Sequence, residues 1–189
     1  FCTCGVGFDA AVSQKFAEEK RRGSLTYIKN TVAEYLSYKP EPYELLVDNQ
    51  TIKEKAFLVA CANASQYGNN AFIAPHANIQ DGRMDLTILS PFTPLDIAPL
   101  AIQLFTKQID RNSKIKTMKA QQVTIIRQNP GVMHLDGEPV MADSRIDISI
   151  MPQSLHVVTP EVVSFTEEVH NLFGEVTRFF DKKLPYIFR

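Results

Sequence analysis

The sequence predicts one mainly β domain with flanking helices, an α+β arrangement around a sandwich-like core. Short apolar runs recur at near-regular spacing between residues 43 and 158 and are separated by turn residues, which favours a sandwich or barrel-like sheet arrangement. Helix-forming stretches lie before residue 38 and after residue 164. With 189 residues and 44% hydrophobic content, the chain is long enough to bury one core.

The chain is expected to begin with a strand and two helices. Residues 1–10 indicate the end of a strand that runs into a glycine-containing turn. Residues 10–38 are rich in helix-forming side chains, and Gly23 divides them into two helices. Pro40 and Pro42 end the second helix because proline cannot donate a backbone hydrogen bond.

From residue 43 onward the sequence predicts mainly strands. Two of them, residues 43–47 and 56–62, flank a turn at residues 48–50, and we expect them to pair as an antiparallel hairpin. Thr93, which is followed by proline, is the expected cap of a helix that ends near Ile109. The other predicted strands are residues 84–89, 115–118, 123–127, 132–135, 146–150 and 155–158.

The end of the chain, residues 161–189, is expected to add an amphipathic helix and a tail to a first domain at residues 1–160. Ser164 and Glu167 have the spacing of a capping box, and apolar side chains follow at helical intervals. We expect this apolar stripe to pack on the sheet or on a partner chain, which leaves a homodimer open. Residues 182–189 are basic and aromatic, so they suit an anionic membrane surface or form an ordinary terminus.

Charge and cysteine content exclude several classes of protein. The 20 lysines and arginines are balanced by 21 acidic residues, so no strong field favours nucleic acid. Apolar runs are interrupted within about ten residues, whereas a transmembrane helix needs roughly 20. Three cysteines are too few for a disulfide scaffold and lack the spacing of a zinc site, which points to a cytoplasmic protein. Because the chain starts at Phe1, we expect it to be a fragment of a longer protein.

The most informative motif is Asp136-Gly137-Glu138, which lies between two apolar runs. It places two carboxylates on a tight turn between predicted strands. A carboxylate held there can act as a general base if its pKa and position suit the proton that moves. Asp-Gly between alternating apolar residues is also a strong hairpin signal. The motif by itself therefore leaves both catalysis and a simple turn open.

A second loop, residues 78–83, offers donors that suit a hard cation. A carboxylate from Asp81 together with exposed backbone carbonyls can bind magnesium or calcium. The same residues can equally form a turn in which the aspartate caps the chain's own amides. The loop therefore predicts either a cation site or a self-capped turn.

The remaining polar motifs predict no further chemistry. The sequence has no Gly-x-Ser-x-Gly elbow, and Gly5-Val6-Gly7 lacks the third glycine of a dinucleotide fingerprint. The histidines are scattered, so structural roles are expected rather than metal binding: His76, His134, His156 and His170.

Six short segments occur together in an order that resembles the C-terminal domain of the diacylglycerol kinase-like lipid kinases. That family includes bacterial diacylglycerol kinases, YegS-type lipid kinases and sphingosine kinases. The resemblance covers about residues 1–160. The matching segments are GVGFDAAV (5–12), GSLTY (23–27), NASQYG (63–68), IAPHA (73–77), DGRMDL (81–86) and LDGE (135–138).

The resemblance implies the β-sandwich domain of the NAD kinase/diacylglycerol kinase-like fold, on the acceptor side of a two-domain lipid kinase. The ATP-binding N-terminal domain, with its Gly-Gly-Asp-Gly-type loop, is absent from this sequence. By the same resemblance, Glu138 draws the hydroxyl proton from the lipid alcohol. Asp136 helps through magnesium or water, or only shapes the turn. The resemblance further implies a loop-ordering magnesium ion bound by Asp81 and the carbonyls of Asn78 and Arg83.

The sequence departs from the family pattern in one loop. The family's usual Gly-Gly after the tyrosine is here Gly68-Asn69-Asn70. Asparagine tolerates left-handed backbone geometry, so we expect the turn to survive.

Two other functions remain open, an NAD kinase-like enzyme and a non-catalytic lipid-binding or assembly module in which Asp136-Gly137-Glu138 is only a hairpin turn. For the kinase we expect ATP as the phosphate donor, Mg²⁺ as cofactor and a diacylglycerol-like or sphingoid lipid at the membrane surface as substrate. The isolated chain is expected to be inactive, since the site for the phosphate donor lies elsewhere.

Overall fold

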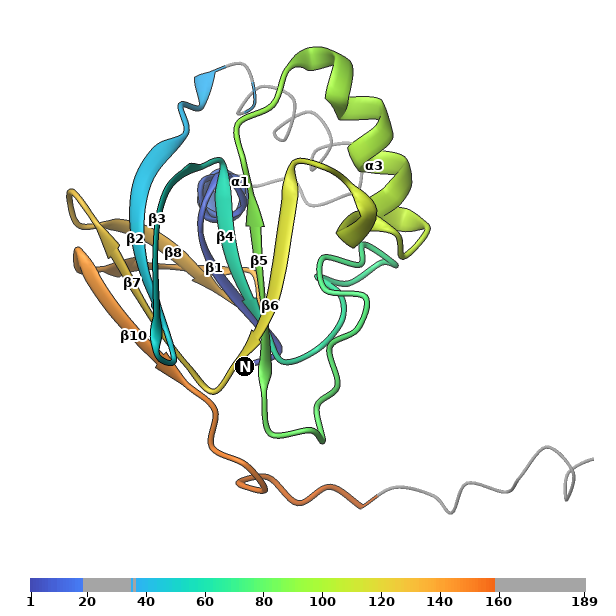
Figure 1. The fold of residues 1–189 in the computed structure, drawn as a ribbon, viewed down its shortest axis with the longest axis vertical. Helices are drawn as coiled ribbons and strands as arrows, with labels where there is room; N and C mark the ends of the chain where they lie inside the picture. The colour runs from blue at the N-terminus through green and yellow to red at the C-terminus, as the bar shows by residue number, and fades with distance from the viewer. Residues whose placement is uncertain (19–34, 36, 159–189) are drawn as a thin grey trace, which may run out of the picture. The chain divides into compact units, whose positions relative to one another are not determined.

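The computed structural model describes residues 1–18, 35 and 37–158, whose arrangement is shown in Figure 1. The chain divides into two compact units, residues 1–154 and 155–189, and the helices and strands reported below belong to the first. Most of the helix predicted after Gly23, and the amphipathic helix predicted within residues 161–189, lie outside the described residues.

The larger sheet has six antiparallel strands in the order β6-β5-β4-β1-β8-β9. The first strand of the chain lies inside this sheet, between β4 and β8. It is therefore a direct neighbour of the strand that leads into Asp136-Gly137-Glu138. The strands are β1 (Thr3–Gly7), β4 (Leu58–Ala62), β5 (Met84–Leu89), β6 (Ile115–Ala120), β8 (Gly131–Leu135) and β9 (Glu138–Ala142).

The smaller sheet has four antiparallel strands in the order β10-β7-β2-β3. They are β2 (Glu41–Val47), β3 (Gln50–Ala56), β7 (Gln122–Arg127) and β10 (Arg145–Ser149). The predicted hairpin between residues 43–47 and 56–62 was wrong, because β2 pairs with β3. The chain crosses to the other sheet at Phe57, whose amide donates to the carbonyl of Leu89 at 2.7 Å, and β4 pairs there with β1 and β5.

The main core lies between the two sheets. In β2 and β7, buried residues alternate with more exposed ones, which is the pattern of a sheet with one face toward solvent. β4 and β5 are instead buried along their whole length, so both faces of the larger sheet are covered there. The core side chains from both sheets include Val6, Leu45, Val59, Leu86, Ile88, Val123, Ile125 and Ile148. The predicted β sandwich is confirmed.

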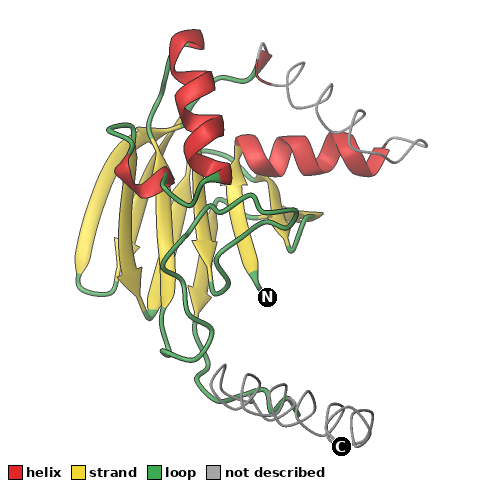
Figure 2. Cartoon of the chain, turned by 90° about the vertical axis from the view of Figure 1, so that its right-hand side faces the viewer, coloured by secondary structure: helices red, strands yellow, loops and turns green. Residues whose placement is uncertain are grey.

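Helices and loops cover the second face of the larger sheet. α1 (Phe8–Glu18) packs against β1, β8 and β9. α3 (Ile97–Phe105), seen beside the strands in Figure 2, follows the short helix η1 (Pro94–Asp96) and precedes η2 (Ile109–Arg111). Leu100 of α3 and Ile109 of η2 join Leu58, Leu89 and Ile115 of the sheet in a second apolar cluster. The sandwich therefore carries a third, partial layer over β4 and β5.

Two predicted element boundaries were wrong. The helix that starts after Thr93 ends at Phe105 rather than near Ile109, because Lys107 adopts a left-handed conformation with φ of 60°. Residues 155–158 form an exposed coil instead of a strand. Among the described residues, no strand pairs with the backbone N–H and C=O groups of these four residues.

No helix in the described part of the chain is long and apolar enough to cross a membrane.

Candidate functional site

Asp136 and Gly137 form the two-residue turn that joins β8 to β9, and Glu138 is the first residue of β9. Both turn residues have positive φ, 51° for Asp136 and 87° for Gly137. Positive φ at both central positions is the geometry of the hairpin turn that matches strand twist, and Asp-Gly is a preferred sequence for it. The predicted turn is confirmed, and it leaves the side chain of Glu138 exposed.

Asp136 fastens the turn to the N-terminus of β1. Its Oδ1 accepts hydrogen bonds from the amides of Cys2 at 2.7 Å and Thr3 at 2.8 Å. Its own amide donates to the carbonyl of Thr3 at 2.8 Å. Because one oxygen of Asp136 accepts hydrogen bonds from two amides of the first strand, this side chain serves the position of the turn.

Arg127 fastens the other end of the same hairpin. This buried side chain donates to four backbone carbonyls, two at the start of β8 and two around the end of β9. The acceptors are Gly131 at 2.6 Å, Ala142 at 2.8 Å, Val132 at 3.0 Å and Asp143 at 3.3 Å. Because Arg127 ends β7 of the smaller sheet, it ties that sheet to the hairpin that carries Glu138.

Behind the turn, a buried network joins α1, β8 and the loop after β4. Oδ2 of Asp9, in the first turn of α1, lies 3.1 Å from Nε2 of His134 and accepts the Tyr67 hydroxyl at 2.7 Å. The Nδ1 of His134 lies 3.4 Å from the amide nitrogen of Gly137. The network therefore reaches from α1 to the residue that precedes Glu138.

Two glycines make room for this network. A Cβ on Gly5 would lie 2.7 Å from Oδ2 of Asp9 and 3.1 Å from Nε2 of His134. Gly7 has a φ of 105°, and a Cβ there would lie 2.7 Å from the carbonyl oxygen of Phe57. Glycine at position 5 therefore lets Asp9 and His134 come close to β1, and glycine at position 7 lets the chain at Phe57 do so.

The surroundings of His134 favour its charged form. Burial by itself lowers the pKa of His134, but the hydrogen bond to Asp9 and the charges of Asp9 and Asp136 outweigh it and raise the pKa. The imidazole edge also meets the Tyr67 ring, with centroids 5.7 Å apart at 68°. The expected structural role of His134 agrees with this buried, paired position.

The loop that positions Tyr67 keeps its turn despite the two asparagines. Asn69 and Asn70 both have left-handed backbones, with φ of 49° and 62°, as the sequence led us to expect. The amide of Tyr67 donates to the carbonyl of Ala71 at 3.0 Å, and the amide of Ala71 donates back to Gly68 at 2.9 Å. This closed turn fixes the backbone of Tyr67, whose hydroxyl donates to Asp9.

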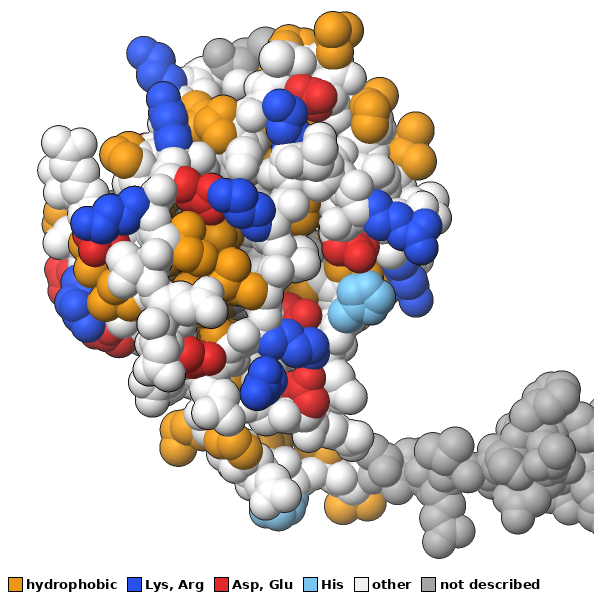
Figure 3. Space-filling view, viewed as in Figure 1, with side chains coloured by type: hydrophobic (Ala, Val, Ile, Leu, Met, Phe, Trp, Pro, Cys, Tyr) orange, Lys and Arg blue, Asp and Glu red, His pale blue; other side chains and the backbone are white. Residues whose placement is uncertain are grey.

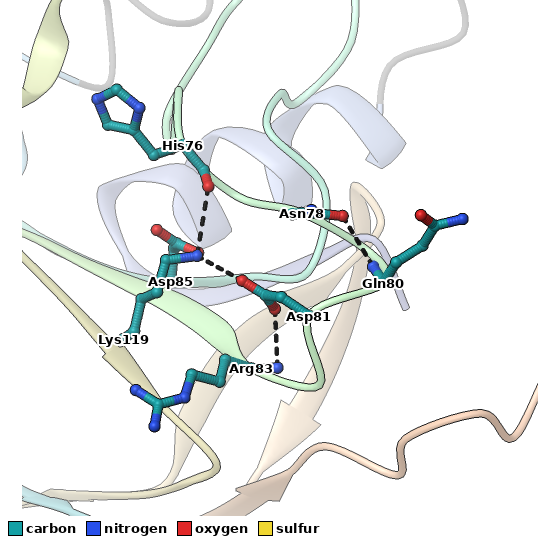
Figure 4. Close-up of polar contacts among 7 residues, drawn as sticks. All are labelled: His76, Asn78, Gln80, Asp81, Arg83, Asp85 and Lys119. Carbon is teal, nitrogen blue, oxygen red and sulfur yellow. Dashed lines mark hydrogen bonds and ion pairs between the residues drawn. The ribbon is translucent and has the colours of Figure 1, made fainter.

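The predicted magnesium donors lie in the loop shown in Figure 4. Asp81 Oδ2 accepts the ammonium of Lys119 at 2.6 Å, and its Oδ1 accepts the amide of Arg83 at 2.9 Å. The carbonyl of Asn78 accepts the amide of Asp81 at 3.2 Å. As arranged, these groups do not fit a divalent ion, since an ammonium and backbone amides take the oxygens that an ion would need.

Other metal arrangements are also lacking in this part of the chain. Within residues 1–18, 35 and 37–158, no three His, Cys, Asp or Glu side chains come together as a metal-binding group would require. The magnesium site of Asp81, Asn78 and Arg83 stays a prediction, and Lys119 is the side chain with which an ion would compete.

A cavity of about 290 Å³ lies beside α1 and is lined by Gly7, Gln14, Tyr43, Arg127 and Gly131 among others. Burial raises the pKa of Tyr43 to about 12, so its phenol stays neutral. The cavity borders the start of β8, whereas the carboxylate turn follows the end of that strand. The cavity therefore lies at the opposite end of β8 from the carboxylate turn.

Sequence reasoning found the turn but missed the residues behind it. Asp9 and Tyr67 lie within segments that carry the family resemblance, yet the local sequence assigns a role to neither. A strand glycine at position 5 is the one local signal, because a missing side chain in a strand often marks a close approach.

The comparison with known families agrees with this architecture. Residues 2–159 match the family described as the YegS C-terminal NAD kinase beta sandwich-like domain. The chain belongs to this family. The resemblance inferred from the six sequence segments is thereby confirmed, together with the two-sheet sandwich fold.

Several proteins that are similar to this chain have names that refer to lipid kinases. The chain is 26% identical over 157 residues to a protein of Shewanella frigidimarina named "Probable lipid kinase YegS-like". It is 27% identical over 162 residues to a diacylglycerol kinase of Mycobacterium tuberculosis. Each match covers 82% of this chain and 50% of the relative, so the chain spans about half the length of these proteins.

A solved structure supports the fold. A diacylglycerol kinase from Bacillus anthracis superposes with a TM-score of 0.52 at 20% identity, covering 79% of this chain and 48% of the other. At that identity the likeness concerns the fold.

Proposed function

We propose that the full protein is an ATP-dependent lipid kinase, that this chain is its acceptor-side domain, and that Glu138 is the general base. The observation that carries the proposal is the exposed carboxylate of Glu138 on a hairpin fastened at both ends by Asp136 and Arg127. A base must be free to meet its substrate and yet be precisely placed. The exposure of Glu138 and the fastened hairpin that carries it support this role, whereas Asp136 is committed to two amides.

In the proposed reaction, the lipid hydroxyl oxygen attacks the γ-phosphorus of ATP while Glu138 accepts the hydroxyl proton. A phosphorus–oxygen bond to the lipid forms as the bond to ADP breaks. Phosphoryl transfer depends mainly on positioning and on neutralising the phosphates. Mg²⁺ bound with ATP would supply the neutralising charge, and most of the ATP site would lie outside this chain.

We propose that this is a cytoplasmic protein that meets its lipid at a membrane surface. Large apolar side chains of η1 and α3 are exposed, namely Leu95, Ile97, Ile102 and Phe105. α3 contains no charged residue, and Lys107 follows it. Figure 3 shows hydrophobic side chains on the surface where Figure 1 draws α3. Exposed apolar side chains next to a cation suit the interface of an anionic bilayer.

The test is phosphate transfer by the full-length protein from radiolabelled ATP to lipid extracts presented in vesicles. We expect Glu138→Gln to lower turnover by about 10²–10⁴-fold, the usual contribution of a general base, without changing the melting temperature. Glu44→Gln is the matched control, because Glu44 is a carboxylate on the smaller sheet that pairs with Lys53. It should keep full turnover.

Near-wild-type turnover in Glu138→Gln would remove Glu138 from the mechanism and favour a non-catalytic lipid-binding or assembly role for this chain. The family description also names NAD kinase, so NAD is the competing acceptor. Transfer of label to NAD in place of lipid would overturn the lipid assignment.

A further inference from the structure

We propose that the ammonium of Lys119 is the built-in cation of the loop formed by residues 76–85, in the place that the family resemblance assigns to a divalent metal ion. This inference does not depend on the proposed kinase activity. It rests on the contacts that Lys119 makes with groups from three positions of the loop.

Three oxygens surround the ammonium, two from the loop before β5 and one from Asp85 at the start of β5. Lys119 Nζ donates to Asp81 Oδ2 at 2.6 Å and to the carbonyl of His76 at 3.3 Å, and it lies 3.2 Å from Asp85 Oδ2. An ammonium has three N–H donors and no acceptor, so three oxygens match its capacity. Figure 4 shows the side chain of Lys119 pointing into this group of oxygens.

The sheet itself holds Lys119 in position. Lys119 of β6 lies directly opposite Asp85 of β5 in the antiparallel register. Side chains in directly opposed positions point to the same face of a sheet, about 5 Å apart. The lysine therefore reaches the loop from a rigid strand.

The acidic side chains depend on this cation. Asp85 Oδ2 is buried and has no hydrogen-bond partner among the described residues, so its ion pair with Lys119 compensates its burial. The hydrogen bond from Lys119 lowers the pKa of Asp81, and the same bond raises the pKa of Lys119. Without the ammonium, two carboxylates would lie side by side uncompensated.

Two further side-chain oxygens of the loop already accept hydrogen bonds from backbone amides. Asp81 Oδ1 accepts the amide of Arg83, and Asn78 Oδ1 accepts the amide of Gln80 at 2.9 Å. Mg²⁺ requires close to six oxygens at about 2.0–2.1 Å. A divalent ion could gather such oxygens here only by displacing Lys119. Removing that side chain should accordingly create a cation site from Asp81, Asp85 and the His76 carbonyl.

The experiment compares the full-length protein with Lys119→Met by thermal unfolding and calorimetric titration, in EDTA and in millimolar MgCl₂ or CaCl₂. We expect the wild-type melting temperature to be the same with and without divalent ions. Lys119→Met should melt about 2–4 °C lower in EDTA and recover when Ca²⁺ or Mg²⁺ is added. Its titration should show ion binding that the double variant Lys119→Met/Asp81→Asn lacks.

Lys116→Met is the matched control, because Lys116 lies on the same strand and pairs with the single carboxylate of Glu54. Divalent ions should not restore its stability. Ion binding by the wild-type protein that disappears in Asp81→Asn would overturn the proposal, since it would mean that a metal already occupies the loop. Unchanged stability of Lys119→Met in EDTA would overturn it as well.

Discussion

The Asp9–His134 contact and the Asp81–Lys119 contact both join an aspartate to a basic side chain, but their surroundings differ. The side chains of His134 and Asp9 are 2% and 10% exposed, whereas those of Lys119 and Asp81 are 34% and 26% exposed. The buried contact joins α1 to the hairpin that carries Glu138. The exposed contact orders a loop at the edge of the sheet.

An aspartate paired with a basic side chain can have a different role when the pair is buried than when it is partly exposed. A buried ion pair that loses one partner leaves an uncompensated charge in a low-dielectric environment. A partly exposed pair is screened by water and salt and can be replaced by an ion from solution. We therefore expect the His134 contact to be required for the fold around Glu138, and the Lys119 contact to be exchangeable.

The largest difference should follow from removing His134 and His76 in turn, two histidines of the described residues that each face an aspartate. His134→Ala should lower the free energy of unfolding by about 3 kcal/mol, because it strips Asp9 of a buried partner. His76→Ala is the matched control, since His76 lies 3.3 Å from Asp110 but its side chain is 74% exposed. Urea unfolding measures both variants. A loss below about 1 kcal/mol for His134→Ala would contradict the role given to the buried network.

A smaller effect is expected from crowding the buried contact without removing a charge. Gly5→Ala places a methyl group 2.7 Å from Asp9 Oδ2 and 2.9 Å from the carbonyl of Val59, so it should cost about 1–3 kcal/mol of stability. Gly131→Ala is the control, because its new Cβ would have no neighbour closer than the Arg127 guanidinium at 3.4 Å. Equal urea midpoints for the two variants would mean that the Asp9–His134 approach is not tight.

The smallest effect should appear in the pH dependence, where the two contacts respond in opposite directions. The pKa of His134 is raised above 6.5, so its stabilisation is complete below that pH and is lost as the pH rises through the raised value. The pKa of Asp81 is lowered below 3.8, so its stabilisation is complete above that pH and is lost as the pH falls through the lowered value.

Urea midpoints of the wild type, His134→Gln and Asp81→Asn test these directions. The advantage of the wild type over His134→Gln should shrink from about pH 6 to about pH 9, and its advantage over Asp81→Asn should shrink below about pH 4. An advantage over His134→Gln that grows with pH would mean that the network favours neutral imidazole.

Some parts of the site follow from local sequence. Asp136 and Gly137 adopt positive φ because these residue types tolerate it, so the turn could be predicted from two neighbouring positions. Asn69 and Asn70 likewise adopt positive φ, which asparagine tolerates. The prediction of the loop at residues 78–83 named Asp81 but not the side chain that it meets, because Lys119 lies 38 positions away.

Other parts depend on pairing between distant segments. Asp9 is 125 positions from His134 and 58 from Tyr67, and no periodicity links them. Polar and apolar residues alternate in β5, yet Thr87 is buried and donates to the carbonyl of Ile73 at 3.0 Å. The loop after β4 covers that side of the strand, which an isolated strand pattern cannot reveal.

The sequence by itself determined most strands, the hairpin turn with its two acids, and the family to which the chain belongs. Tertiary structure decided that β4 leaves β3 for the other sheet, that His134 meets Asp9, and that Lys119 meets Asp81. Local elements follow from the conformational preferences of neighbouring residues, which the sequence records directly. Strand partners do not follow from local sequence, because backbone N–H and C=O groups are alike at nearly every residue. The register is selected instead by burial of the core that the paired strands share.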